Sequence, residues 1–353
     1  MGAQGLSIPR DWDDITPEWM TAALSGHFPG VEVSAVNLLM RTDGTNKRAR
    51  FGVEYSSGSG PAQVFAKAPD PGHAELNNAT GGLFNEPRLF QTGVALPVDH
   101  PTPYLSLIDE SALNYIIVME DVTTRAADPL NATRAMTVEQ AVNGVRALGR
   151  LHTKYWGQRI ANEPALGWVQ PYVAWGRMGS KIPVAIELMG DSCPDEVRAM
   201  TVKEIIEDTW VPYIGSLSTS PQTLLHGDAH IGNTYLLPDD EVGFLDWQVV
   251  RRGNWSVDVG YFLQGALSLE DRRQSERDIL EEYRAALDLP AQERPSAEEA
   301  FLRYRASASH GLALWLSTLS TPDWQAREVS LSLAQRYSAA FVDLESRSAV
   351  SAV

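Results

Sequence analysis

The stretch Thr223–Gln248, which reads TLLHGDAHIGNTYLLPDDEVGFLDWQ, constrains this chain more than any other part of it. Asp228 and Asn233 lie five residues apart in a polar loop between two apolar runs, and Asp246 follows the β-prone run Val242–Leu245. An Asp, an Asn five positions later and an Asp that closes a β-hairpin form the arrangement that phosphoryl transfer requires. One Asp accepts the proton of an attacking hydroxyl, while the Asn and the second Asp hold Mg²⁺ on nucleotide phosphates. The pattern therefore predicts Asp228 as catalytic base and Asn233 and Asp246 as metal ligands.

The motifs HGDAHIGN and FLDWQ together resemble the aminoglycoside phosphotransferase and choline kinase-like family, and they are also similar to the ecdysteroid kinase-like proteins. The resemblance implies a bilobal, protein-kinase-like α+β fold with a small N-terminal β-sheet lobe and a larger, mainly helical C-terminal lobe. It assigns residues 1–118 to the nucleotide-binding lobe, 119–123 to a hinge and 124–353 to the catalytic and acceptor-binding lobe. It also implies ATP, with GTP as an alternative, together with Mg²⁺ and a small-molecule hydroxyl acceptor.

Net charge and cysteine content narrow the class of protein. The 353 residues carry 29 Lys and Arg against 45 Asp and Glu, a formal net charge of −16. Such a chain should repel nucleic acid and anionic membranes, and no apolar run approaches the roughly 18 residues of a membrane span. Cys193 is the single cysteine, so no internal disulfide can form, and the N-terminus lacks a signal-peptide pattern. We expect a cytoplasmic protein without nucleic-acid or membrane partners; its oligomeric state stays open.

The N-terminal third predicts one helix followed by strands. Thr16, Pro17 and Glu18 suit a helix start, and the helix should end near Gly26. A loop over Pro69–Gly82, rich in turn-forming residues, follows the third strand and is expected to be mobile. The predicted elements are a helix over Pro17–Leu24, strands over Val31–Met40, Arg48–Tyr55, Gln63–Ala68 and Tyr115–Met119, and a helix that starts at Asn85.

The turn between the first two strands is the first candidate nucleotide contact. Read alone, Thr42–Asn46 is an ordinary hairpin turn. The family resemblance instead implies that this turn covers the phosphates, with Gly44 allowing close backbone approach and Thr45 and Asn46 donating hydrogen bonds. Both interpretations stay open at the level of sequence.

Lys67 lies in VFAKAP, at the end of the third predicted strand. An unpaired ammonium is costly to bury, so a lysine flanked by apolar residues needs an anionic partner; an edge lysine whose head reaches solvent is the alternative. The resemblance implies that Lys67 binds the nucleotide α- and β-phosphates and pairs with Glu86. It also places the backbone of Glu120 and Val122 at the adenine.

The C-terminal region is predicted to be mainly helical. Within the central motif His226 is expected to orient the loop, and His230 to face the phosphates or solvent. The resemblance assigns Asp258 to bracing the catalytic loop through backbone hydrogen bonds, and His152 is expected to be a core histidine. Helices are predicted over Thr137–Trp156, Val197–Tyr213, Ser256–Leu267, Glu270–Leu287, Ala297–Ser320 and Thr321–Leu344.

Other functions remain to be weighed against a kinase. His226, Asp228 and His230 would share one face of a strand and could form a metal-dependent hydrolase site, because imidazole and carboxylate suit Zn²⁺. A catalytically dead nucleotide-binding module is disfavoured because Lys67, Asp228, Asn233 and Asp246 fill all the expected polar roles. The acceptor is expected to be a moderately apolar alcohol or a hydroxyacyl compound, since His310–Trp315 is apolar enough to line a pocket. An aminoglycoside is the alternative acceptor.

Overall fold

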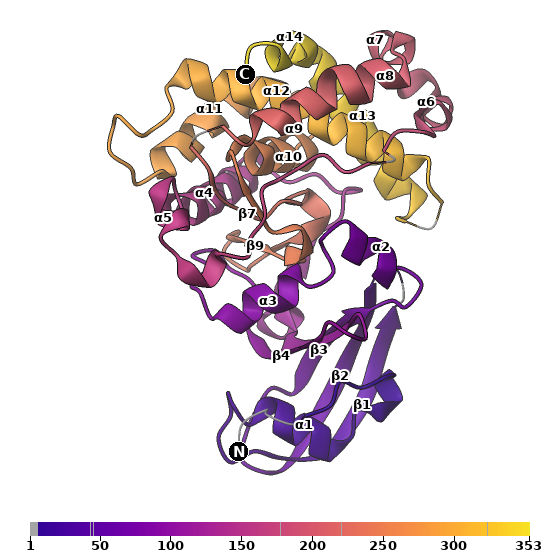
Figure 1. The fold of residues 1–353 in the computed structure, drawn as a ribbon, viewed down its shortest axis with the longest axis vertical. Coiled ribbons are helices and arrows are strands. Elements are labelled where there is room, and N and C mark those ends of the chain that lie inside the picture. Colours follow the sequence, from indigo (N-terminus) through magenta and orange to yellow (C-terminus); the bar gives the residue numbers. More distant parts are fainter. Residues whose placement is uncertain (1–5, 43, 45, 177, 220, 323) are drawn as a thin grey trace. The chain divides into compact units, whose positions relative to one another are not determined.

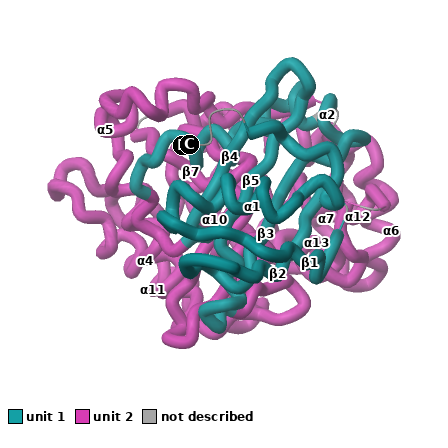
Figure 2. Tube along the Cα trace, turned by 90° about the horizontal axis from the view of Figure 1, so that it is seen from below, with its two compact units in different colours: residues 1–95, 100–127 teal, residues 96–99, 128–353 magenta. Residues whose placement is uncertain are grey.

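The computed structural model describes residues 6–42, 44, 46–176, 178–219, 221–322 and 324–353. The chain divides into two compact units, one of residues 1–95 with 100–127 and the other of residues 96–99 with 128–353 (Figure 2). The division falls after Ala127, whereas the predicted hinge at 119–123 lies inside the first unit; that hinge stays a prediction. Within the described residues, no helix has the length and apolar character needed to cross a membrane.

The first unit is built on a five-stranded antiparallel sheet with the order β1-β2-β3-β5-β4 (Figure 1). The four predicted strands are confirmed, but the edge strand β4 was not predicted. Its segment begins with prolines at 101 and 103, which argue against a strand unless it lies at a sheet edge. The strands are β1 (Glu32–Thr42), β2 (Asn46–Ser57), β3 (Gln63–Pro69), β4 (Pro103–Asp109) and β5 (Asn114–Glu120).

The two faces of this sheet have different partners because side chains alternate along each strand. Ala66 of β3 belongs to the core cluster that also contains Trp19 and Met20 of α1 (Pro17–Leu24). Phe65, one position earlier, packs instead against the cluster that contains Phe84. Lys67 therefore shares the face of Phe65, opposite α1.

The turn-rich segment after β3 is more ordered than its composition suggests. It was predicted as a loop, but it contains the short helix α2 (Ala74–Ala79), and Ala74 is buried in the core with Leu83. The next helix, α3 (Asn85–Thr92), starts where the sequence predicted and ends at Gly93, whose φ of 64° is left-handed. Gly93 suits this helix end because glycine adopts that conformation without a Cβ penalty.

The second unit is mainly helical, and most of its helices lie above β7 and β9 in the view of Figure 1. Its α10 is buried along its whole length and contacts α4, α12 and α13. The strand pairs are short: β7 pairs with β10, and β8 lies between β6 and β9. The strands are β6 (Asp128–Pro129), β7 (Thr223–Leu225), β8 (Thr234–Leu236), β9 (Val242–Phe244) and β10 (Arg251–Gly253); the main helices are α4 (Val138–Lys154), α6 (Ile182–Met189), α10 (Ser256–Ala266), α11 (Leu269–Ala286), α12 (Ala297–Leu319) and α13 (Arg327–Asp343).

Two predicted helices differ from the structure. The helix predicted over Val197–Tyr213 is broken, because Thr201 starts a new helix with a capping box: its hydroxyl accepts from the Glu204 amide, and the Glu204 carboxylate accepts from the Thr201 amide. The segment consists of α7 (Asp195–Ala199), α8 (Val202–Ile205), a π-helical stretch over Ile206–Trp210, and α9 (Val211–Ser216). The helix predicted from Thr321 begins only at Arg327.

Candidate active site

Asp228 and Asn233 are brought together by a short loop that leaves β7 and ends in a 3₁₀ turn, Ile231–Asn233. The Asn233 amide nitrogen donates to the Asp228 carboxylate oxygen Oδ2 at 3.0 Å and to the Asp228 carbonyl at 2.9 Å. The Asp228 side chain is 26% exposed, so it is accessible to a reactant. Because both hydrogen bonds of Asn233 use Nδ2, its Oδ1 is the atom left to ligate a cation.

Asp246 lies just beyond β9, on the far side of the β8–β9 hairpin. Its neighbour Leu245 connects it to the loop: the Leu245 amide donates to the Asn233 carbonyl at 2.7 Å, and the Leu245 carbonyl lies 2.9 Å from His226 Nε2. Asp246 itself has φ 62° and ψ 72°. A left-handed backbone at a residue other than glycine is costly and is found preferentially at functional sites.

His226 connects the loop and the hairpin in one tautomer. The Leu245 carbonyl can only accept, so Nε2 of His226 carries the proton. Nδ1 then accepts from the Asp228 amide at 3.3 Å. The ring is fully buried, with its centroid 4.6 Å from that of Trp247. His226 therefore orients the backbone of Asp228 and has no exposed nitrogen for chemistry.

Gly227 has to be glycine. Its φ is +84°, and a Cβ at this position would lie 2.0 Å from the Val249 carbonyl oxygen. Its amide donates to Asp258 Oδ1 at 2.8 Å, and the His226 amide donates to Asp258 Oδ2 at 2.7 Å. The structure thus places Asp258, 1% exposed on α10, where its carboxylate accepts two backbone hydrogen bonds from the loop.

His152 belongs to this support, which the sequence reasoning did not foresee. Its Nε2 lies 3.3 Å from Asp258 Oδ2, and its Nδ1 lies 2.9 Å from the Tyr283 hydroxyl. As the carboxylate accepts, His152 donates from Nε2 and accepts from Tyr283. Only the spacing of His152 within its helix could be read from the sequence, and that spacing indicates burial but not a partner 106 residues away.

His230 is buried, so the expectation that it faces solvent is wrong, whereas its orientation toward the phosphates stays a prediction. It is 8% exposed, and the Gly232 amide donates to its Nδ1 at 3.0 Å. Its ring centroid lies 5.8 Å from that of Tyr261 and 5.2 Å from that of Trp315, both in edge-on contacts. Burial lowers the pKa of His230 to about 4, so its ring is neutral at pH 7. The Nε2 atom lies 3.9 Å from Asp228 Oδ2.

This geometry argues against the metal-hydrolase alternative. Both ring nitrogens of His226 and the Nδ1 of His230 are engaged in hydrogen bonds within the protein. Among the residues that the structure describes, no group of three His, Cys, Asp or Glu side chains is arranged to hold a metal ion. Asn233 and Asp246 stay the predicted metal ligands, and their hard oxygen atoms would suit Mg²⁺ rather than Zn²⁺.

In the first unit, Lys67 and Glu86 form a buried ion pair. Lys67 on β3 is 3% exposed and Glu86 on α3 is 2% exposed, with Nζ and Oε2 2.5 Å apart. The alternative interpretation, an edge lysine whose head reaches solvent, is therefore wrong. Lys67 has the anionic partner that its burial requires.

The turn at the end of β1 contains the other predicted phosphate contacts. Asn46, the first residue of β2, is 2% exposed, and its Oδ1 accepts from the Tyr115 hydroxyl at 2.9 Å. Gly44 is exposed, and a Cβ there would have only the Asn46 carbonyl within 4 Å. Thr45 lies outside the described residues.

The predicted adenine contacts follow β5. Glu120 forms an ion pair with Arg125, with Oε1 and Nε 2.9 Å apart, and it accepts a hydrogen bond from the Thr102 amide at 3.2 Å. Val122 is 6% exposed and begins a short 3₁₀ turn capped by Asp121, which also pairs with Arg50. The side chains at this position are thus engaged in structure, and any contact with a base would use the backbone.

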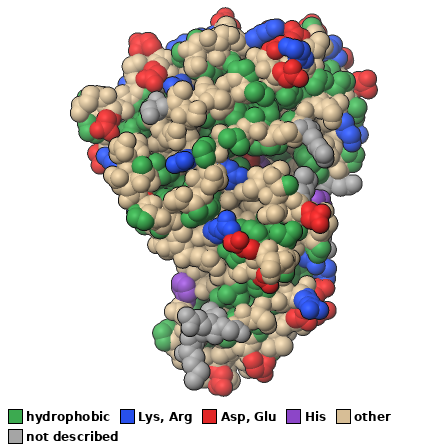
Figure 3. Space-filling model, viewed as in Figure 1, with side chains coloured by type: hydrophobic (Ala, Val, Ile, Leu, Met, Phe, Trp, Pro, Cys, Tyr) green, Lys and Arg blue, Asp and Glu red, His purple; other side chains and the backbone are tan. Residues whose placement is uncertain are grey.

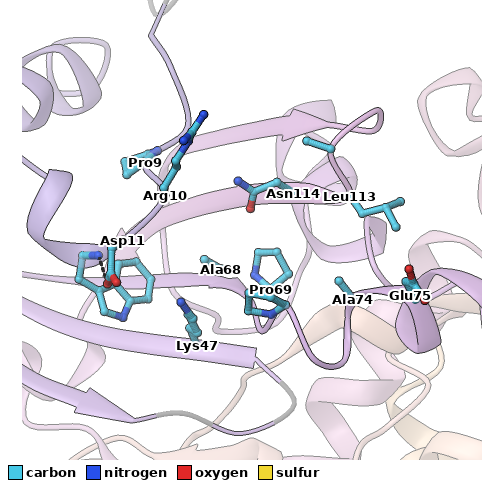
Figure 4. Close-up of a pocket in the computed structure, with 13 residues that line it drawn as sticks. Pro9, Arg10, Asp11, Lys47, Ala68, Pro69, Ala74, Glu75, Leu113 and Asn114 are labelled. Carbon is cyan, nitrogen blue, oxygen red and sulfur yellow. Dashed lines mark hydrogen bonds between the residues drawn. The ribbon is translucent and has the colours of Figure 1, made fainter.

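A separate cavity of about 350 Å³ lies in the first unit (Figure 4). Its lining comes from the N-terminal segment, β2, β3, α2 and the β4–β5 turn. Lys47 and Ala68 line it, whereas Lys67, which neighbours Ala68 and points to the opposite face, does not. None of the described residues predicted to bind nucleotide lines this cavity. The lining residues are Pro9, Arg10, Asp11, Trp12, Lys47, Ala68, Pro69, Pro71, Ala74, Glu75, Ala112, Leu113 and Asn114.

Sequence comparison decides the family. The sequence model of the phosphotransferase enzyme family matches residues 88–316, more than half of the chain and all of the central motif. The chain belongs to this family. It is therefore a phosphotransferase that acts on hydroxyl groups, as the central motif predicted. No curated protein sequence gives a significant match to the chain.

Solved structures give the same picture for the fold. A spectinomycin phosphotransferase, solved in complex with ADP and spectinomycin, is 12% identical, and the match covers 94% of this chain and 99% of that chain with a TM-score of 0.50. A choline kinase from Streptococcus pneumoniae is 16% identical over 92% of this chain and 98% of that chain, with a TM-score of 0.49. The predicted α+β, kinase-like fold is confirmed.

Proposed function

We propose that this phosphotransferase is an ATP-dependent kinase of a small-molecule alcohol, in which Asp228 is the catalytic base. The observation that carries the proposal is the contact between Asp228 and Asn233. It orders a partly exposed carboxylate and, five residues away, an amide oxygen free to bind a cation. The ADP in the spectinomycin phosphotransferase of similar fold supports a nucleotide as the donor, with GTP as the alternative to ATP.

Each proposed residue has one role in the transfer. Asp228 accepts the proton of the acceptor hydroxyl while that oxygen forms a bond to the γ-phosphorus; the bond from this phosphorus to the β–γ bridging oxygen breaks, and ADP leaves. Asn233 Oδ1 and Asp246 would hold Mg²⁺, which neutralises charge on the phosphates. Lys67, fixed by Glu86, binds the α- and β-phosphates.

The remaining proposed contacts act through position. The turn with Gly44, Thr45 and Asn46 covers the phosphates, and the backbone of Glu120 and Val122 meets the base. Asp258 and His226 hold the loop that carries Asp228. Hydrogen bonds from fixed groups of this kind lower a barrier because the reactants do not have to be ordered during the reaction.

The acceptor is proposed to be moderately apolar. Residues 259–353 contain fourteen acidic and ten basic side chains. Several of the acidic groups are already paired: Asp343 with Arg272 and Arg273, and Glu345 with Arg305. On the face drawn in Figure 3, acidic and basic side chains are interspersed. A polycationic acceptor would instead need a cluster of unpaired carboxylates.

Exposed apolar side chains of the second unit support the same choice. The stretch His310–Trp315 is buried except for the half-buried Leu314, and its role as a pocket lining stays a prediction. The exposed apolar side chains are Val173, Val184, Val211 and Trp324.

Phosphate transfer to a panel of acceptors tests the proposal. Purified protein with Mg²⁺ and [γ-³²P]ATP would be offered sterol-like alcohols, hydroxyacyl thioesters and aminoglycosides in parallel. Transfer to the apolar alcohols or thioesters, absent in Asp228→Ala, is the expected result. Transfer to aminoglycosides alone would overturn the apolar acceptor and leave the kinase proposal intact.

A further inference from the structure

Three buried side chains from distant parts of the chain meet behind the catalytic loop. Trp210 comes from the π-helical stretch, His310 from α12, and Tyr172 from the segment that precedes α6. They are 1%, 0% and 3% exposed. Trp210 Nε1 lies 3.2 Å from His310 Nδ1, His310 Nε2 lies 3.3 Å from the Tyr172 hydroxyl, and that hydroxyl lies 3.2 Å from the Gly227 carbonyl oxygen.

The chemistry of the two ends fixes the direction of every hydrogen bond in this chain. The Gly227 carbonyl can only accept, so the single hydroxyl proton of Tyr172 is used there. Tyr172 must then accept from His310, which places a proton on Nε2. The indole nitrogen of Trp210 can only donate, so His310 Nδ1 must be the acceptor. Only the neutral Nε2–H tautomer of His310 satisfies all three contacts.

The groups around these three side chains keep His310 and Tyr172 in their neutral forms. Burial lowers the pKa of His310 to about 3, although the nearby Asp258 acts in the opposite direction. Burial and the charges of Asp228 and Asp258 raise the pKa of Tyr172 well above its usual value, although Arg251 acts in the opposite direction. Tyr261 packs edge-on to His310, with ring centroids 4.9 Å apart, and burial raises its pKa as well.

The hydrogen-bond chain ends at the peptide group that joins Gly227 to Asp228. Its carbonyl oxygen accepts from Tyr172, and its N–H donates to His226 Nδ1. Both polar atoms of this one peptide are therefore held by side chains, and its orientation determines where the Asp228 side chain begins. On the other side of Gly227, the amide is held by Asp258.

We propose that Trp210, His310 and Tyr172 are positioning residues for catalysis, which form a one-directional hydrogen-bond chain that fixes the Gly227–Asp228 peptide. The inference rests on the proposed role of Asp228 as base. It also explains how the position of Asp228 is fixed: Asp258 holds the loop on one side of Gly227, and the hydrogen-bond chain holds it on the other. Loss of the chain should affect the transfer step and not nucleotide binding, because none of its members is proposed to contact the nucleotide.

Tyr172→Phe removes only the hydroxyl that connects His310 to Gly227. ADP release from Mg²⁺·ATP, with the best acceptor of the panel, should show kcat lower by about 10- to 100-fold, the order of effect of a misplaced catalytic group. The KM for ATP should stay within about twofold. Tyr304→Phe is the matched control, because this tyrosine is equally buried in α12 and donates to Glu276 Oε2 at 2.9 Å, away from the loop. Its kcat should stay within about twofold of wild type.

Equal losses of kcat in Tyr172→Phe and Tyr304→Phe would overturn the positioning role and indicate a general loss of packing. A kcat of Tyr172→Phe within twofold of wild type would overturn it as well. His310→Gln can keep one donor and one acceptor, so it should retain more activity than His310→Leu; equal activity of these two would contradict the chain.

A nitrogen-15 NMR spectrum of the histidine rings separates this inference from the proposed function. The His310 ring should give the neutral Nε2–H pattern from pH 8 to pH 5, and its Nε2 signal should move in Tyr172→Phe. A protonated ring at pH 6, or the Nδ1–H tautomer, would overturn the chain whatever the activity. Full activity in Asp228→Ala would instead overturn the proposed base and leave the NMR result standing.

Discussion

The Lys67–Glu86 pair of the first unit and the loop of the second unit that carries Asp228 are held in place by different means. Lys67 forms a buried ion pair with Glu86, with Nζ and Oε2 2.5 Å apart. The loop from His226 to Asn233 is fixed by many contacts, most of them from neutral groups to backbone atoms: Tyr172 and His226 hold the peptide before Asp228, and Leu245 holds Asn233. An ion pair is lost when either partner is removed, whereas a network of hydrogen bonds should lose its function in steps.

The difference fits the role that we propose for each site. A lysine that binds phosphates has to remain charged, and a buried charge requires a charged partner. A loop that carries a catalytic base has to place its carboxylate precisely, and neutral hydrogen bonds do this without adding charge near Asp228. The Asp258 carboxylate that supports the loop is stabilised by hydrogen bonds from two backbone amides and from His152.

Removal of Asp228 from the loop should have the largest effect on activity. Asp228→Ala is expected to lower kcat by about 10²–10⁴, because a general base typically contributes that factor. Single-turnover kinetics with a fixed acceptor would measure the loss. The control is Asp239→Ala, an exposed aspartate in the β8–β9 turn, which should leave kcat unchanged. Similar losses in both variants would mean that charge near the hairpin, and not the base, matters.

Removal of Lys67 should lower the stability of the protein, because it breaks the buried pair with Glu86. Lys67→Ala leaves Glu86 buried without its lysine, and loss of one partner from a buried pair costs about 3–5 kcal/mol. Urea unfolding would measure this change in the free energy of unfolding. The exposed pair of Arg134 with Asp128 is the control: Arg134→Ala should cost less than about 1 kcal/mol. Equal costs would contradict the view that burial makes the Lys67–Glu86 pair matter more for stability than an exposed pair.

Acid should lower the free energy of unfolding by a smaller amount, because it protonates His310 in the unfolded chain, whereas this ring is neutral in the network that supports the loop. Because the pKa of His310 is lowered to about 3 in the folded protein, the unfolded chain binds more protons between about pH 6.5 and pH 3. The stability from His310 is complete above about pH 6.5 and is lost as pH falls, by about 1.4 kcal/mol per pH unit.

The comparison of wild type with His310→Gln over pH 7 to 5 isolates this contribution. Urea unfolding of His310→Gln should show a shallower loss of stability in acid than wild type. The exposed His27, replaced by Gln, should leave the wild-type slope unchanged. Parallel slopes in wild type and His310→Gln would show that His310 is not kept neutral by the fold.

Local patterns predicted much of this molecule. The alternation in Gln63–Ala68, the capping residues Thr16 and Thr137, and the spacing of Asp228, Asn233 and Asp246 all describe contacts between near neighbours in sequence. These features gave the strands, α1, α4 and the hairpin that follows the loop. Family resemblance added Glu86 as the partner of Lys67, which no local pattern could identify.

Contacts between distant residues could not be predicted in the same way. His310 reads as one residue in an apolar helix, and Tyr172 lies in a segment punctuated by glycine and proline. Their shared role depends on the packing of α12 against the π-helical stretch, which brings together residues 138 and 100 positions apart in the chain. The break in Val197–Tyr213 was missed for a local reason: the apolar spacing continues across Thr201, although a capping box restarts the helix there.

The most direct test of the central claim is a thermal melt with Mg²⁺ and ATP in wild type and in Asp246→Ala. At about 100 times the dissociation constant, the nucleotide should stabilise wild type by roughly 2.7 kcal/mol. Each kcal/mol raises Tm by about 2–4 °C for a protein of this size. The account predicts a shift in Tm that requires Mg²⁺ and is lost in Asp246→Ala. No shift with ATP or GTP in wild type, or an equal shift in Asp246→Ala, would contradict it.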